Sequence, residues 1–179
     1  FGIDVKARYF SQVQDDQQVR QALGQAQQRG LPVLVIGGGS NLLLTRDIDA
    51  LVLHMASRGR RVLSDDGERI VVEAEAGEPW HAFVQWALAQ GYCGLENLSL
   101  IPGTVGAAPM QNVGAYGVEI KDVFAGLTAL DRETGALRDF SLAECAFGYR
   151  DSLFKRNPGR WLILRVRFAL TRTLHAHLD

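Results

Sequence analysis

The stretch Gly37-Gly38-Gly39-Ser40-Asn41-Leu42 follows directly after the apolar run at residues 32–36, which is typical of a short strand buried on both faces. Three consecutive glycines let successive main-chain N–H groups turn toward one point, in conformations that a Cβ would block. Such a nest binds phosphate, whereas an ordinary exposed turn needs only one or two glycines. The stretch favours an anion-binding loop; a tight solvent-exposed turn stays open as the alternative.

Two familiar phosphate motifs do not fit this loop. The sequence has no Gly-Lys-Ser or Gly-Lys-Thr, which excludes a P-loop, and Leu42 stands where a GxGxxG motif needs its third glycine. Residues 42–45 do not open an amphipathic helix, so the Rossmann arrangement is excluded as well. The anion must be held in another way.

A second stretch of small residues runs from Gly94 to Gly117 and carries no charge between Glu96 and Glu119. A loop of this length inside a compact domain is usually functional. Small residues let the main chain approach a flat ligand, and neutral amide and hydroxyl groups suit a heterocycle with a diphosphate. A packed loop whose glycines only fit its bends is the alternative. The candidate ligand-binding residues of this stretch are Pro102, Gly103, Thr104, Gly106, Ala107, Ala108, Gln111, Asn112, Gly114, Ala115, Tyr116 and Gly117.

Apolar periodicity on either side of these loops predicts the other elements. A helix capped by Asp15 or Asp16 should bury Val19, Leu23 and Ala26. A second helix, after Pro79, should carry an apolar stripe. We assign the tryptophan of this stripe, Trp80, to the core rather than to stacking on a cofactor ring. That stripe consists of Trp80, Phe83, Val84, Ala87 and Leu88. Expected strands cover residues 8–13, 32–36, 51–53, 126–131, 136–140 and 161–170, with a hairpin at 61–74 and a capping box at 141–144. The last strand should present Leu162, Leu164, Val166, Phe168 and Leu170 on one apolar side.

Composition excludes several classes of protein. With 19 basic and 20 acidic residues, the chain has no charge excess that would recruit nucleic acid, and no apolar run reaches the roughly 20 residues of a membrane span. Cys93 and Cys145 suggest neither a zinc site nor a disulfide framework, which favours a reducing compartment. His175 and His177 are expected to be solvated rather than metal ligands. No signal peptide is visible, and the natural start is expected to be missing before Phe1.

Five ordered motifs resemble one family over nearly the whole chain: Phe1-Gly2-Ile3, the loop at residues 37–42, the run from Gly94 to Gly106, Gln111-Asn112-Val113-Gly114-Ala115-Tyr116-Gly117, and Phe147-Gly148-Tyr149-Arg150-Asp151-Ser152. Together they are similar to the UDP-N-acetylenolpyruvoylglucosamine reductases, the MurB family. The resemblance implies an α+β, two-lobe FAD-binding fold of the vanillyl-alcohol-oxidase/PCMH type. We expect lobes at residues 1–57 and 58–179, with noncovalent FAD held on residues 37–42 and 102–117.

The resemblance also implies the chemistry. NADPH reduces the flavin, whose N5 passes hydride to the enolpyruvyl ether of UDP-N-acetylglucosamine enolpyruvate, giving UDP-N-acetylmuramate for peptidoglycan and cell-wall synthesis in the cytoplasm. Hydride addition places negative charge on the substrate carboxylate, which a nearby cation must stabilise. Arg150 matches the catalytic arginine, and Tyr116 and Tyr149 are expected to flank it at the substrate site. From its sequence neighbourhood alone, Arg150 beside Asp151 would be a surface ion pair.

The family continues past Asp179 into a substrate domain that carries a proton-donating serine and an assisting glutamate, and neither has a counterpart here. The chain is therefore expected to be an inactive flavin-binding fragment of a reductase that is a monomer at full length, without a metal, a membrane partner or a nucleic-acid partner. Two alternatives are a nucleotide-binding module without catalysis and an alcohol oxidase of the same flavoprotein class.

Overall fold

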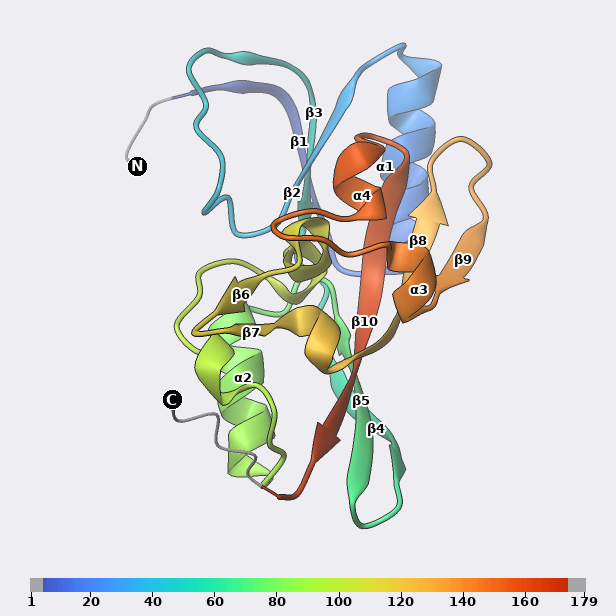
Figure 1. Cartoon of the computed structure of the whole chain (residues 1–179). Helices are drawn as coiled ribbons and strands as arrows, with labels where there is room; N and C mark the ends of the chain where they lie inside the picture. Colours follow the sequence, from blue (N-terminus) through green and yellow to red (C-terminus); the bar gives the residue numbers. More distant parts are fainter. Residues whose placement is uncertain (1–4, 174–179) are drawn as a thin grey trace.

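The first part of the chain forms a three-stranded parallel sheet with one helix (Figure 1). The computed structural model describes residues 5–173, so Phe1-Gly2-Ile3 and the two terminal histidines lie outside the described residues. The elements are β1 (Ala7–Val13), α1 (Asp16–Gln28), β2 (Val33–Ile36) and β3 (Ile48–Met55), with β3 between the other two strands. This confirms the expected β-α-β-β unit, although β3 extends well beyond the predicted residues 51–53.

The sequence did not decide whether Asp15 or Asp16 caps the start of α1, and in the structure the cap is Asp15. Asp15 is the N-cap, and its carboxylate accepts a hydrogen bond of 2.8 Å from the main-chain N–H of Gln18. Val19, Ala22 and Ala26 are buried, whereas Leu23 is partly buried at the edge of the same core. The helix therefore packs through its small and β-branched residues.

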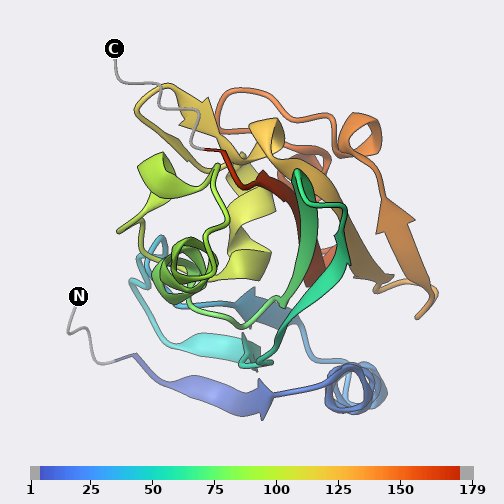
Figure 2. The ribbon, with the colours of Figure 1, turned by 90° about the horizontal axis from the view of Figure 1, so that it is seen from below.

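The rest of the chain builds a five-stranded antiparallel sheet in the order β4-β5-β10-β8-β9. Its strands are β4 (Arg60–Asp65), β5 (Arg69–Glu75), β8 (Phe124–Asp131), β9 (Leu137–Phe140) and β10 (Trp161–Thr171). The predicted Asp-Gly turn joins β4 to β5, where Gly67 has a φ of 95° and Asp65 accepts a hydrogen bond from the Gly67 N–H. Seen from below in Figure 2, the parallel sheet forms a separate layer beneath this curved sheet.

Helix α2 (Trp80–Ala89) lies against one face of the antiparallel sheet and supplies the larger core. Trp80 is buried, and its indole N–H donates to the carbonyl of Leu98 at 2.7 Å, which confirms that Trp80 packs in the core. The predicted stripe is wrong at one residue, because Leu88 is 38% exposed. The helix is short and its last turn extends past the sheet-facing contacts, so only its first four stripe residues are buried.

Strand β10 links the two cores, and here the expected single apolar side is wrong. Leu162 and Leu164 pack with α1 and the parallel sheet, whereas Val166, Phe168 and Leu170 pack with α2. The pairing of β10 with β8 shifts between Ile163 and Arg165, which marks a β-bulge at Leu164. A bulge places two consecutive side chains on one side and reverses the alternation after it. One strand therefore contributes to both cores.

Short elements complete the chain between the sheets. They are η1 (Glu96–Leu98), η2 (Val105–Gln111), β6 (Gly114–Ala115), β7 (Val118–Glu119), η3 (Ile120–Asp122), α3 (Leu142–Cys145) and α4 (Leu153–Arg156). The predicted capping box is present, with Ser141 and Glu144 bonded to each other's main-chain N–H. Residues 5–173 contain no helix that is both long and apolar enough to cross a membrane.

Removing the ring of Phe168 should destabilise the fold strongly. Phe168 is fully buried, and its ring lies 5.1 Å from the ring of Phe83 and 5.8 Å from that of Trp80, measured between centroids. We expect Phe168→Ala to lower the free energy of unfolding by about 3–5 kcal/mol, measured by urea titration with tryptophan fluorescence. Leu137→Ala serves as the control because Leu137 is 45% exposed, and a comparable loss in both variants would contradict the packing described here.

Candidate functional site

The two glycine-rich loops, at residues 37–42 and 102–117, lie against each other although 59 residues separate them in the sequence. A Cβ added to Gly37 would lie 2.4 Å from Oγ1 of Thr104, and one added to Gly38 would lie 3.5 Å from Cα of Gly103. Asn41 also donates a long side-chain hydrogen bond of 3.5 Å to Gln111. Gly37 can lie against the Thr104 side chain, and Gly38 against the Gly103 main chain, because neither glycine has a side chain of its own.

The first loop has free main-chain donors. Within residues 5–173, the N–H groups of residues 37–41 donate no hydrogen bond to another part of the protein, and neither do those of Gly103 and Thr104. Residues 38–41 are exposed, so these donors face solvent beside the contact between the loops. Several free N–H groups around one point are the arrangement expected for binding a diphosphate.

Other glycines of the second loop serve packing. A Cβ on Gly106 would lie 2.5 Å from Cβ of Ala76, and the N–H of Gly106 donates to the Ala76 carbonyl at 2.9 Å. A Cβ on Gly114 would lie 2.9 Å from the Val118 carbonyl, across the β6–β7 hairpin. Ala108 is also buried. The packed-loop alternative is therefore correct for part of the stretch, and these residues shape the site rather than offer polar groups to a ligand.

One cavity opens on the contact between the loops, and a second lies against the second loop alone. The smaller, of about 260 Å³, lies between β2, η2 and the adjoining ends of β8 and β10, and Gly37, Thr104 and Ala107 line it. The larger, of about 630 Å³, lies between the β6–β7 hairpin and the turn after α3. Its lining consists of Ile101, Gln111, Asn112, Val113, Gly114, Ala115, Tyr116, Gly117, Val118, Glu119, Tyr149 and Arg150.

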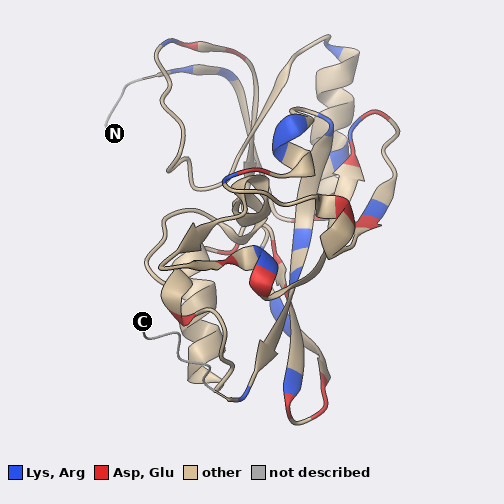
Figure 3. Cartoon of the chain, viewed as in Figure 1, with Lys and Arg blue, Asp and Glu red and all other residues tan. Residues whose placement is uncertain are grey.

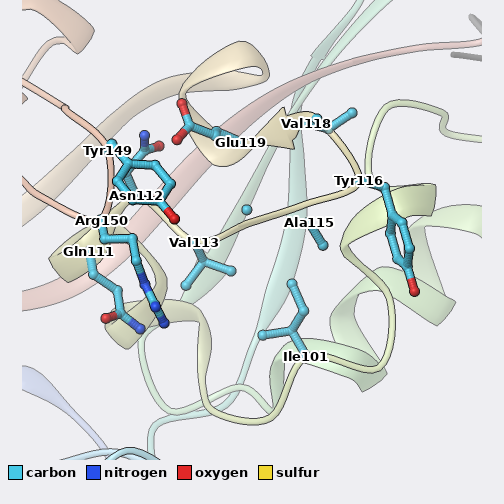
Figure 4. A pocket seen from close by; sticks show the side chains of 12 residues that line it. Ile101, Gln111, Asn112, Val113, Ala115, Tyr116, Val118, Glu119, Tyr149 and Arg150 are labelled. Carbon is cyan, nitrogen blue, oxygen red and sulfur yellow. The ribbon is translucent and has the colours of Figure 1, made fainter. Parts of the chain in front are cut away.

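In the larger cavity, Arg150 and Tyr149 lie on one side with Gln111, and Tyr116 lies on the other (Figure 4). The rings of Tyr149 and Tyr116 are 87% and 86% exposed, and the Tyr116 ring points away from Arg150. The structure therefore brings Arg150, Tyr149 and Gln111 together, while Tyr116 stands at the opposite rim.

Asn112 holds the turn that carries Arg150. Its buried side chain donates to the carbonyl of Gly148 at 3.1 Å and accepts from the N–H of Lys121 at 3.2 Å. Ser152, fully buried, adds a second link by donating to the carbonyl of Met110 at 2.6 Å. Both side chains attach the Gly148–Asp151 turn to η2. Asn112, predicted as a ligand-binding residue, uses its polar side-chain atoms inside the protein.

Unusual backbone conformations gather around this cavity. Asn112, Tyr116 and Arg150 have φ values of 45°, 53° and 50°, and Leu100, just before the lining residue Ile101, has a φ of 62°. Side chains with a Cβ adopt this left-handed region at a cost, and such residues concentrate at functional sites. The local fold therefore fixes Tyr116 and Arg150 in positions that an unstrained loop would not give them.

The charge of Arg150 is not neutralised by the part of the chain that the structure describes. Its guanidinium takes part in no ion pair there, because the adjacent Asp151 pairs with Arg156. The only acidic residue lining the larger cavity is Glu119, and a hydrogen bond from Lys121 lowers the pKa of its carboxyl. Figure 3 shows that η3, directly after the β6–β7 hairpin, carries both a basic and an acidic residue. The sequence-based alternative, an Arg150–Asp151 ion pair, is therefore wrong.

Two further predicted residues, Leu42 and Pro102, line neither of the two cavities. Leu42 and Pro102 are exposed, and the N–H of Leu42 donates to the Gly39 carbonyl at 3.4 Å. The sequence did not point to Ile101, Val118 or Arg132, which line the cavities. Ile101 and Val118 are single apolar residues with no functional signal of their own, and Arg132 lies between two acidic residues in a hairpin, where an ion pair is the usual expectation. Within residues 5–173, no cluster of side chains suits a metal ion.

Comparison with known proteins supports a flavin site. The chain is 99% identical over its full length to a UDP-N-acetylenolpyruvoylglucosamine reductase of Pseudomonas putida, of which it covers 53%. It is 54% identical over 174 residues to the reductase of the same name from an Azoarcus strain, covering 50% of that protein. The resemblance seen in the motifs is thus confirmed, and the chain spans about half the length of these curated relatives.

Solved structures agree on the fold. The crystal structure of a UDP-N-acetylenolpyruvylglucosamine reductase from Thermus caldophilus superposes with a TM-score of 0.71 at 27% identity, over 92% of this chain and 56% of that one. A 6-hydroxy-D-nicotine oxidase from Arthrobacter nicotinovorans gives a TM-score of 0.70 at 20% identity, over 95% of this chain and 38% of that one. The fold is the two-lobe type of these flavoproteins, as predicted. Because the FAD binding domain family matches residues 7–141, the chain belongs to the family of FAD binding domains.

Proposed function

We propose that the chain is the flavin-binding half of an NADPH-dependent reductase that converts UDP-N-acetylglucosamine enolpyruvate to UDP-N-acetylmuramate in the cytoplasm. The observation that carries this proposal is the contact between the two glycine-rich loops, with free N–H donors beside it and Arg150 at the adjoining cavity. The names of the curated relatives support the choice of reaction. On this proposal the activity serves peptidoglycan synthesis and, through it, cell division and cell shape.

The residues of the cleft fit FAD. The free N–H groups of residues 37–41, with Ser40 and Asn41, would hold the diphosphate, and Thr104 would contact it from the second loop. Gln111, Ala115 and Tyr116 would border the ring system in the larger cavity. Bound FAD supplies hydride transfer from NADPH to the enolpyruvyl carbon.

In this proposal, Arg150 binds the substrate carboxylate and stabilises the negative charge that develops on it. A guanidinium stays charged and can hold a carboxylate through two hydrogen bonds. No described carboxylate competes for it, and Asn112 and Ser152 fix its turn. Preorganised charge of this kind lowers the barrier because little reorganisation is needed during the reaction. Tyr149 would lie beside the same carboxylate. The protonating serine and the assisting glutamate would come from the other half of the protein.

A second function follows from the fold alone. Oxidases share this fold at 20% identity and below, so a cradle of this kind also serves other flavin chemistry. A flavoprotein oxidase would bind FAD but would have no use for a cation facing a substrate carboxylate. We therefore place the reductase first, because Arg150 is exposed, held in a strained turn and free of an acidic partner within residues 5–173.

Filling the contact between the loops should weaken flavin binding. We expect Gly38→Val to weaken FAD binding by the 179-residue chain by about tenfold or more, because the branched side chain separates loop 37–41 from Gly103 and removes charged hydrogen bonds. Quenching of flavin fluorescence measures the affinity. Gly24→Ala is the control, since a Cβ at this position in α1 meets no atom within 4 Å, and FAD binding by Gly38→Val at the control level would count against the site.

Arg150 should matter for the second half-reaction. In a protein that joins this chain to the remaining half of its relatives, Arg150→Ala should slow flavin reoxidation by the enolpyruvyl substrate by about 100-fold or more. Reduction by NADPH should stay near normal, and stopped-flow absorbance of the flavin separates the two steps. Arg58→Ala, at an exposed arginine between the sheets, is the control. Normal reoxidation in Arg150→Ala would rule out the catalytic assignment.

Asn112 should act by positioning the Arg150 turn. Asn112→Gly keeps the left-handed backbone but removes the hydrogen bonds to Gly148 and Lys121, each worth about 1 kcal/mol. We expect faster amide hydrogen exchange over residues 148–152, with little change in β10. Asn97→Gly is the matched control, because Asn97 makes no side-chain hydrogen bond to a described residue. Unchanged exchange in Asn112→Gly would show that the turn is held by other contacts.

A further inference from the structure

His81, near the start of α2, is a polar side chain that the proposed function does not use. Its Nδ1 atom lies 3.2 Å from the main-chain nitrogen of Leu100 and 3.2 Å from Oγ of Ser99. Ile101, which follows these two residues, lines the larger cavity (Figure 4). A side chain of α2 therefore contacts the segment that forms one wall of this cavity.

The N–H of Leu100 decides the protonation state of His81. A main-chain N–H can only donate a hydrogen bond, so Nδ1 must accept it and carries no proton. The imidazole is therefore neutral, with its proton on Nε2. Within residues 5–173, no other group accepts the Leu100 N–H. An imidazolium would place a second donor against this N–H and break the contact.

The charged groups beside this end of α2 have other partners. Glu78 pairs with Arg60 at 3.3 Å, and Glu96 of η1 accepts the N–H of Gly94 with both carboxylate oxygens. The other short helix that packs on α2, η2, carries no titratable side chain. Among the described residues, His81 takes part in no ion pair. Protonation of His81 would therefore add a charge without an acidic partner.

Leu100 depends on this hydrogen bond because its backbone is strained. Its φ is 62°, in the left-handed region, and the residue is 77% exposed, so packing does not hold it. Trp80 holds the chain on either side, through its indole N–H to the Leu98 carbonyl and its main-chain N–H to the Gly103 carbonyl. His81 is thus the described side chain that holds the strained residue between these two points.

We propose that neutral His81 is a positioning residue that fixes Leu100, and thereby the Ile101 wall of the larger cavity, for the ring system of FAD. This inference rests on the proposed flavin site and extends it to a residue of α2 outside both glycine-rich loops. In this role His81 acts through the main chain of residues 99–101 rather than by touching the ligand. Flavin binding should therefore weaken when the imidazole is removed or protonated.

Two substitutions at His81 separate the hydrogen-bond acceptor from the rest of the ring. Asn can place its side-chain oxygen where Nδ1 stands and does not titrate, whereas Ala removes the acceptor. We expect His81→Ala to exchange the Leu100 amide hydrogen about five- to tenfold faster and to bind FAD about five- to tenfold more weakly. His81→Asn should bring both values back to within about twofold of the unaltered chain. Hydrogen exchange followed by NMR without FAD, and quenching of flavin fluorescence, measure the two effects.

The pH dependence of binding gives a readout that a purely steric role would not move. Histidine side chains take up a proton between about pH 8 and pH 5. The FAD affinity of the unaltered 179-residue chain should fall as the pH is lowered over this range, because protonated His81 no longer accepts the Leu100 N–H. The fall should be about fivefold smaller in His81→Asn, which keeps every other histidine.

Gln85→Ala is the matched control, because Gln85 is exposed one turn further along α2. Thermal unfolding of each variant separates lost binding from lost folding. Unchanged Leu100 exchange and FAD affinity in His81→Ala would overturn the positioning role while leaving the flavin site intact. The same pH dependence in His81→Asn and the unaltered chain would overturn the role of the neutral imidazole. If the unaltered chain bound no FAD over the whole pH range, the flavin site itself would fail, and this inference with it.

Discussion

The close contact between Gly37 and the side chain of Thr104 is the constraint on which the site depends. A Cβ on Gly37 would lie 2.4 Å from the Thr104 hydroxyl oxygen, so only glycine fits against this threonine. Gly106 holds the second loop in place, because its N–H donates a hydrogen bond to the carbonyl of Ala76, directly after β5. Glycine at these positions lowers the steric cost of contact and leaves free N–H groups around one point. The smaller cavity opens beside this contact, and the larger one lies against the second loop from Gln111 onward.

The β-bulge in β10 lets one strand contribute to both hydrophobic cores. One half of the strand packs its leucines on α1 and the parallel sheet, and the other half packs Phe168 on α2. Arg165 reinforces the first contact through an ion pair of 2.6 Å with Asp16 at the start of α1. Because a single strand belongs to both cores, relative movement of the lobes would disturb both. We keep the division near residue 57 as a proposal, with the lobes joined by a shared strand.

Local patterns predicted most of the fold, and long-range contacts account for what they missed. Caps, turns and stripes involve residues within a few positions, so Asp15, the Asp65–Gly67 turn and the Ser141–Glu144 box were predictable from sequence. The bulge was not, since strict alternation continues through Leu164 in the sequence and only the pairing with β8 breaks it. At the site, the loops and Arg150 were visible as motifs. The inward-bonded role of Asn112 was not, because Gly148 lies 36 residues away.

Pairing of charges separates structural arginines from those available to a ligand. Arg61 and Arg167 both pair with the buried Glu73, and Arg160 takes both acids beside Arg132, so these cations serve the fold. Arg132 and Arg150 line cavities and have no acidic partner among the described residues. In a chain with 19 basic and 20 acidic residues, there is no shortage of carboxylates to neutralise them. Their isolation follows from where their acidic neighbours point: Asp151 toward Arg156, and Asp131 toward Arg160. An anion bound beside Arg150 in the larger cavity would therefore meet a charge that no described acidic residue pairs with.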